Sequence, residues 1–128
     1  MAAALLRRAS ARRGQALVEF ALSVPIMISL FTGIIDVGFL YQHQLVLTNA
    51  VREGARLGTL GQSNAQVQAA VVNYLKTSAY TPLPAASAVS VTIAGGSATV
   101  SLSSSVPFLF SMSGPPVTLR ATTQMRVE

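Results

Sequence analysis

Residues 12–41, RRGQALVEFALSVPIMISLFTGIIDVGFLY, decide the fold of this chain. No residue from Phe20 to Ile35 is charged, and Asp36 is the only charged residue before a second uncharged run over residues 37–51. An α-helix rises about 1.5 Å per residue, so roughly 20 residues cross the hydrocarbon core of a bilayer. The segment from Ala16 to about Phe39 has this length, and we expect it to form a transmembrane helix.

The composition supports this expectation. Hydrophobic residues make up 51% of the chain and charged residues only 10%, a balance typical of membrane-associated proteins rather than of ordinary soluble domains. Cysteine is absent, which excludes disulfides and thiolate metal sites.

The net charge of +5 arises from one segment at the N-terminus. No acidic residue precedes Glu19, while the chain beyond Gly14 holds five basic and four acidic residues and is almost neutral. A nucleic-acid-binding face needs basic residues gathered on a folded surface, so this distribution argues against one. Basic residues ahead of an apolar helix instead predict a cytoplasmic N-terminus and a C-terminal region outside the membrane. The four basic residues ahead of the helix are Arg7, Arg8, Arg12 and Arg13.

The helical pattern continues beyond the length that a bilayer requires. No proline or strong turn signal follows Pro25 until Gly58 and Gly61, so we expect one helix from Gln15 to about residue 58. Pro25 has no N–H to donate to the carbonyl of Ala21, and we expect it to kink or open the helix locally.

The remainder of the chain predicts a small α+β region. After a loop that ends at Ser63 or Asn64 as helix N-cap, residues 65–79 show one apolar face and predict a short amphipathic helix. Residues 89–93 and 98–102 alternate apolar and polar side chains around a Gly-Gly turn, which predicts a β-hairpin with one buried face. A loop with apolar anchors follows, and alternation over residues 117–121 predicts a third strand, giving an antiparallel sheet of about three strands.

The junction RRGQALVEF resembles the class III signal of type IV pilins. In that signal a prepilin peptidase cuts on the cytoplasmic side after a glycine, here Gly14, and leaves the apolar helix attached from Gln15 onward. Ordinary secretory signals are cut after their apolar region at a small-residue site, and no such site follows Ile35. The resemblance therefore implies that residues 1–14 are a cleaved basic leader.

Within this superfamily the chain resembles the TadE-like proteins, minor pseudopilins of tight-adherence (Tad) pili. The resemblance implies three parts: the leader, a transmembrane and extended helix over residues 15–58, and a small periplasmic α+β region over residues 59–128. It implies a single-pass protein of the bacterial inner membrane that enters a pilus for surface adherence. It also implies contacts with membrane lipid, the prepilin peptidase, other pilins and pseudopilins, and the inner-membrane Tad assembly platform. The segments that carry the resemblance are RGQALVEFAL at 13–22, the proline at 25, GIIDVG at 33–38 and NAVREGAR at 49–56.

The resemblance also assigns assembly roles. Glu19 is expected to meet the α-amine of Gln15 in a neighbouring subunit, because an unmatched carboxylate among packed helices is strongly penalised. The distance of Asp36 along the helix, rather than the resemblance, places it about 20 residues from the cytoplasmic edge, so it is expected either at the outer interface of the membrane or as an acceptor for a partner helix. A third group stands at helical spacing beyond the membrane and is expected to form local ion pairs on a solvated face or to dock a partner: Arg52, Glu53 and Arg56.

We expect no enzymatic activity, no cofactor and no metal site. His43 is the sole histidine, and the four acidic residues are scattered along the chain, so no pair for acid–base chemistry is evident. Two alternatives stay open. One is an unprocessed single-pass anchor that presents a small extracytoplasmic binding domain, and the other takes the arginine-rich start as a mitochondrial presequence.

Overall fold

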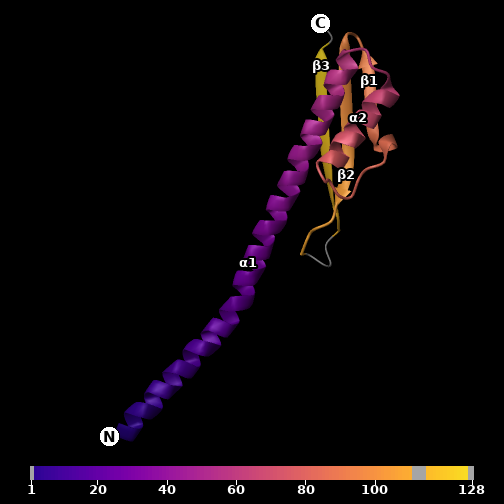
Figure 1. The fold of residues 1–128 in the computed structure, drawn as a ribbon. Coiled ribbons are helices and arrows are strands. Elements are labelled where there is room, and N and C mark those ends of the chain that lie inside the picture. The colour runs from indigo at the N-terminus through magenta and orange to yellow at the C-terminus, as the bar shows by residue number, and fades with distance from the viewer. Residues whose placement is uncertain (1, 111–114, 127–128) are drawn as a thin grey trace. The chain divides into compact units, whose positions relative to one another are not determined.

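The computed structural model describes residues 2–110 and 115–126, and it describes residues 2–13 by their backbone only. The described part is an α+β fold, which confirms the predicted class (Figure 1). It contains a long helix, a shorter helix and a three-stranded antiparallel sheet. In chain order the elements are α1 (Ala2–Thr59), α2 (Asn64–Thr77), the 3-10 turn η1 (Ala86–Ala88), β1 (Val89–Ala94), β2 (Ser97–Val106) and β3 (Val117–Arg126).

Helix α1 is 58 residues long and passes through the boundary between two compact units, Met1–Asp36 (unit 1) and Val37–Glu128 (unit 2). It begins ahead of the predicted start at Gln15, because the backbone before Gly14 is also helical. Pro25 lies inside the helix without ending it, and the predicted kink stays a prediction.

Both helices end in the same backbone motif. After α1 the N–H of Gln62 donates to the carbonyl of Leu57, with Gly61 between them at a φ of 77°. After α2 the N–H of Tyr80 donates to the carbonyl of Leu75, with Ala79 at a φ of 52°. These bonds satisfy carbonyl groups that the helix end would otherwise leave unpaired.

The start of α2 confirms the predicted cap. Ser63 is the N-cap, and its side chain accepts a hydrogen bond from the N–H of Gln66 while the Gln66 side chain accepts one from the N–H of Ser63. This capping box satisfies two donors at the helix start. One face of α2 is buried, as the apolar spacing predicted, through Val67, Val71 and Leu75.

The sheet has the strand order β1-β2-β3, with both pairs antiparallel. Gly95 and Gly96 both have positive φ, as a two-residue hairpin turn requires. Strands β2 and β3 are longer than predicted and pair over ten residues each. The alternation of apolar and polar residues did not predict the end of β2, because Ser104 occupies a buried position that an apolar residue would ordinarily hold.

Unit 2 has two layers, in which α2 and the C-terminal part of α1 cover one face of the sheet (Figure 1). Gly54 allows the close approach: a Cβ built there would lie 2.5 Å from Val71 Cγ2 on α2 and 3.5 Å from Val100 Cγ1 on β2. Gly58 lies one turn later, where a Cβ would be 3.0 Å from that of Ala98. The buried core consists of Leu47, Ala50, Val51, Ala55, Val67, Val71, Leu75, Tyr80, Val89, Val100, Leu102, Val106 and Ala121.

A glutamine from each helix binds a carbonyl of an edge strand. The Gln44 side chain on α1 donates to the carbonyl of Arg120 on β3 at 2.8 Å. The Gln68 side chain on α2 donates to the carbonyl of Val89 on β1 at 2.9 Å. Exposed strand edges invite pairing with other chains, and these bonds protect part of each edge.

Candidate functional site

The predicted cleavage and assembly residues lie on successive turns at the start of the apolar part of α1. The Gln15 side-chain amide donates a hydrogen bond to Glu19 Oε1 at 3.1 Å. Side chains in a helix lean toward its N-terminus, so the Glu19 carboxylate lies over the turn that begins at Gln15. The Gln15 side chain was not predicted as a partner of Glu19, although their i,i+4 spacing was a signal for this hydrogen bond.

Gly14 is exposed, and a Cβ built on it would meet nothing within 4 Å. Packing within the chain therefore does not require glycine at this position. Glycine is the weakest helix former after proline, costing about 1 kcal/mol relative to alanine. Glycine at this position therefore lowers the local helix propensity without a packing reason inside the chain.

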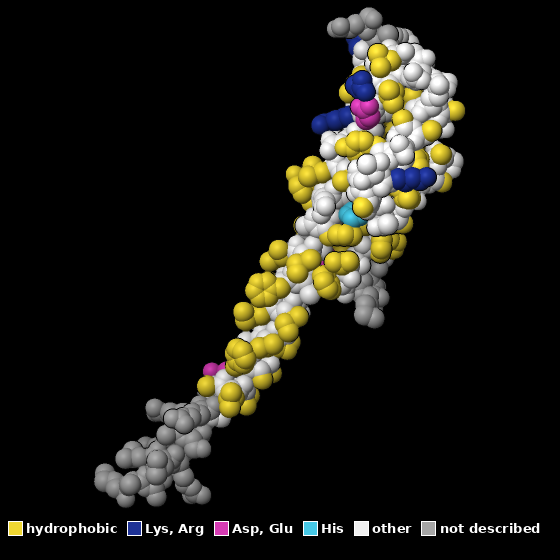
Figure 2. All heavy atoms as spheres, in the orientation of Figure 1, with side chains coloured by type: hydrophobic (Ala, Val, Ile, Leu, Met, Phe, Trp, Pro, Cys, Tyr) yellow, Lys and Arg dark blue, Asp and Glu magenta, His cyan; other side chains and the backbone are white. Residues whose placement is uncertain are grey.

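The stretch after Glu19 exposes apolar side chains around the whole helix. Between Leu17 and Ile35, each exposed large hydrophobic side chain has about half of its surface or more accessible. Figure 2 shows hydrophobic side chains along the surface of α1. None of the residues in the most apolar 18-residue stretch is buried. A contiguous apolar surface of this size is unfavourable in water. Within the described residues, α1 is the one helix long and apolar enough to cross a membrane.

The polar side chains in this stretch bond within the helix itself. The hydroxyl of Ser23 donates to the carbonyl of Glu19, and that of Ser29 donates to the carbonyl of Pro25, each at 2.8 Å. A helix that satisfies its own polar groups is compatible with a hydrocarbon environment. Asp36, the last residue of unit 1, is 6% exposed.

The structure brings together two of the three residues predicted to dock a partner. Arg56 donates to both carboxylate oxygens of Glu53, at 2.6 and 3.0 Å, while Arg52 lies exposed on the same helix. The hydrogen bond from Arg56 lowers the pKa of Glu53 below its usual 4.5. Both side chains are open to solvent, so the pair contributes little to stability.

His43 packs inside unit 2. Its ring lies between those of Phe39 and Tyr80, with centroid distances of 4.1 and 4.8 Å. Its two ring nitrogens lie 3.0 Å from the carbonyl oxygen of Phe39 and 3.1 Å from that of Thr81. The histidine thus connects α1 to the segment after α2. Among the described residues, no three His, Cys, Asp or Glu side chains gather as a metal site would require.

The face of the sheet opposite the helices is polar. It carries Ser and Thr side chains from all three strands, together with Arg120, Gln124 and Arg126. A shallow groove of about 290 Å³ crosses it, with Ser90, Ser101, Ser103 and Thr122 beside Arg120 in its lining. A face rich in hydroxyl groups is well solvated, so we assign it to the aqueous side of the protein.

Residues 14–56 match the model of the family described as TadE-like protein. The match begins at Gly14 and ends in the part of α1 that packs on the sheet. No curated protein and no solved structure matches the chain at a significant level. The predicted TadE-like resemblance is therefore confirmed over residues 14–56.

Proposed function

We propose that this chain, through its TadE-like segment at residues 14–56, is a minor pseudopilin: a structural and assembly component of a Tad-type pilus that mediates surface adherence. It has no catalytic activity of its own. The observation that carries the proposal is the junction at which four arginines, Gly14 and Glu19 meet the start of a long apolar helix. The family match begins at this same glycine.

In this proposal α1 crosses the bacterial inner membrane once. The arginines hold the N-terminus in the cytoplasm, because basic residues flanking a membrane helix are retained on that side. Unit 2 then lies in the periplasm, in keeping with the hydroxyl-rich open face of its sheet. A prepilin peptidase removes residues 1–14 by cutting between Gly14 and Gln15.

Cleavage changes the chemistry beside Glu19. In the unprocessed chain its partner is the neutral amide of Gln15, at 3.1 Å, and an amide does not neutralise a carboxylate. Cleavage exposes a positively charged α-amine on the same residue. A buried carboxylate is strongly penalised without a charged partner, so a neighbouring subunit that supplies this amine favours one register of helix packing.

The remaining assembly residues follow from the same picture. Pro25 removes a helical hydrogen bond and allows the helix to adjust as subunits pack. Asp36 is at the outer end of the apolar segment, and the exposed Arg52 and the Glu53–Arg56 pair face neighbours beyond the membrane. The partners are other pilins and pseudopilins, the Tad assembly platform and lipid.

The test is the intact mass and N-terminal sequence of the protein extracted from its own membrane, with and without active prepilin peptidase. We expect a chain that starts at Gln15 only when the peptidase is active. Gly14→Val should block the cut, because a branched side chain then enters the scissile position, while the matched Gly33→Val should be processed normally. A Cβ built on either glycine meets nothing within 4 Å.

The same strains test the role of Glu19. We expect Glu19→Gln to be processed and retained in the membrane but to be lost from sheared pili, whereas Glu53→Gln should assemble. Chains that keep the leader in both peptidase backgrounds, with Glu19→Gln unaltered in location and partners, would instead establish an unprocessed membrane anchor.

A further inference from the structure

The connection after β2 exposes apolar side chains that the core does not use. Val106 ends the strand and is fully buried, but Leu109 and Phe110 are 54% and 51% exposed. Apolar anchors were expected in this stretch, and Val106 is one, whereas the side chains of Leu109 and Phe110 lie largely at the surface. No charged residue occurs between Lys76 and Arg120, so the described start of this connection, Pro107–Phe110 (the apolar tip), has no charged neighbour in sequence.

The position of the apolar tip along α1 follows from contacts within unit 2. Gly58 lies against Ala98 and Gly54 against Val100, so α1 runs antiparallel to β2. From Gly54 back to Leu40 the helix covers about 21 Å. From Val100 forward to Val106 the strand covers about 20 Å. The tip therefore leaves the sheet at the level of Leu40, at the end where α1 enters unit 2 (Figure 1).

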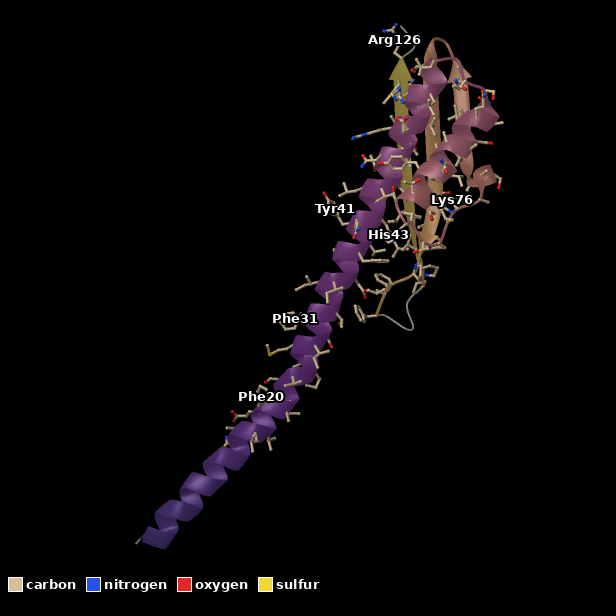
Figure 3. All side chains as sticks on the ribbon, viewed as in Figure 1. Phe20, Phe31, Tyr41, His43, Lys76 and Arg126 are labelled. Atoms are coloured by element: carbon tan, nitrogen blue, oxygen red, sulfur yellow. The ribbon has the colours of Figure 1, made fainter. Side chains whose placement is uncertain are left out.

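That level is the outer end of the predicted transmembrane segment, which closes at about Phe39. Tyr41 is 65% exposed and points away from the sheet, whereas His43 points toward the rest of unit 2 (Figure 3). Val37 is exposed as well. Aromatic residues favour the layer between hydrocarbon and water, so this level has the composition of a membrane interface.

We propose that the apolar tip inserts into the interfacial layer of the same membrane that α1 crosses. Lipid is the occupant that fits, because the tip is uncharged, carries Phe and Leu, and lies level with the helix segment where the lipid environment ends. Unit 2 then touches the membrane at two places, which fixes the orientation of its sheet. The proposal rests on the membrane crossing of α1 in the proposed function.

The absence of cysteine allows one probe at a time to be attached to the full chain. We would make the single variants Leu109→Cys, Leu60→Cys and Phe31→Cys and label each with an environment-sensitive fluorophore. Each labelled protein is then reconstituted into phosphatidylethanolamine–phosphatidylglycerol vesicles. Leu60 is the matched control, since it is also an exposed leucine, at 64%, but lies beyond Gly58 at the opposite end of unit 2. Phe31 reports whether α1 crosses the bilayer.

Lipids brominated on their acyl chains and a water-soluble quencher distinguish the outcomes. We expect brominated lipid to quench the Phe31 and Leu109 probes and to leave Leu60 bright, and iodide to quench Leu60 most strongly. If brominated lipid quenches the Phe31 probe but only iodide quenches the Leu109 probe, the tip does not insert, while α1 still crosses the membrane. A Leu109 probe that neither reagent reaches means that protein covers the tip, which also overturns the insertion. A Phe31 probe that brominated lipid leaves bright refutes the membrane crossing itself.

Discussion

The two parts of α1 that flank the unit boundary place similar apolar residues in opposite surroundings. In residues 15–36 (the apolar half) the large hydrophobic side chains are exposed on every side of the helix. In residues 37–59 (the packed half) the buried positions recur at helical spacing, from Leu47 through Val51 to Ala55, and exposed residues such as Arg52 and Arg56 occupy the other side. In the proposed function the apolar half presents its side chains to lipid, whereas the packed half presents them to its own sheet.

The difference shows what each half demands of its residues. If α1 crosses a membrane as proposed, lipid adapts to the shape of the helix, so the apolar half needs hydrophobicity more than a particular fit. The packed half meets a fixed protein surface, and interiors packed to crystal-like density tolerate neither voids nor extra atoms. Substitutions of one kind should therefore have different effects in the two halves.

The largest contrast is expected from leucine truncation. Leu47→Ala removes a fully buried side chain and should destabilise unit 2 by about 2–5 kcal/mol. Leu30→Ala, on the exposed surface of the apolar half, should change the same free energy of unfolding by no more than about 0.5 kcal/mol. Thermal and urea unfolding of the protein in nanodiscs measures both. Equal losses from the two variants would contradict the separation of the halves.

A smaller contrast is expected between glycines. Gly54→Ala places a Cβ 2.5 Å from Val71 Cγ2, and overpacking of this kind costs about 1–3 kcal/mol, partly offset by a gain of about 1 kcal/mol in helix propensity. Adding Val71→Ala should relieve the clash and reduce the loss. Gly33→Ala in the apolar half meets no atom within 4 Å and should leave the unfolding of unit 2 unchanged. A double-mutant cycle in which Gly54→Ala costs as much in the Val71→Ala background as in the unaltered chain would contradict the clash.

The smallest effect is expected from the ion pair of the packed half. Arg56 lowers the pKa of Glu53 in the folded chain, so the pair stabilises the fold above the unfolded-state pKa of about 4.5. This contribution is lost as the pH falls through the lower folded-state value. Arg56→Gln should therefore lower Tm slightly at pH 7, and the deficit should vanish at low pH or in high salt. A deficit that persists under both conditions would assign Arg56 a packing role instead.

Local signals in the sequence predicted much of this fold. The uncharged run predicted the long helix α1, Ser63 was predicted as a possible N-cap of α2, and the Gly-Gly pair predicted the hairpin turn. Each of these features depends on residues close together in the chain. The TadE-like match covers the junction at Gly14 and Glu19, while cleavage after Gly14 and the assembly role of Glu19 stay predictions. The end of β2 was not predicted from the sequence, because the buried Ser104 breaks the alternation of apolar and polar residues.

The sequence by itself determined the apolar helix, the charge asymmetry around it and the order of elements after it, since hydropathy, charge and backbone preference are properties of neighbouring residues. Only the tertiary structure decided that Gly54 and Gly58 face a packed surface, that Gln44 and Gln68 bind edge strands, and that the apolar tip leaves the sheet at the level of Leu40. These relations join residues far apart in the chain, whose distances are fixed only when the helices pack on the sheet.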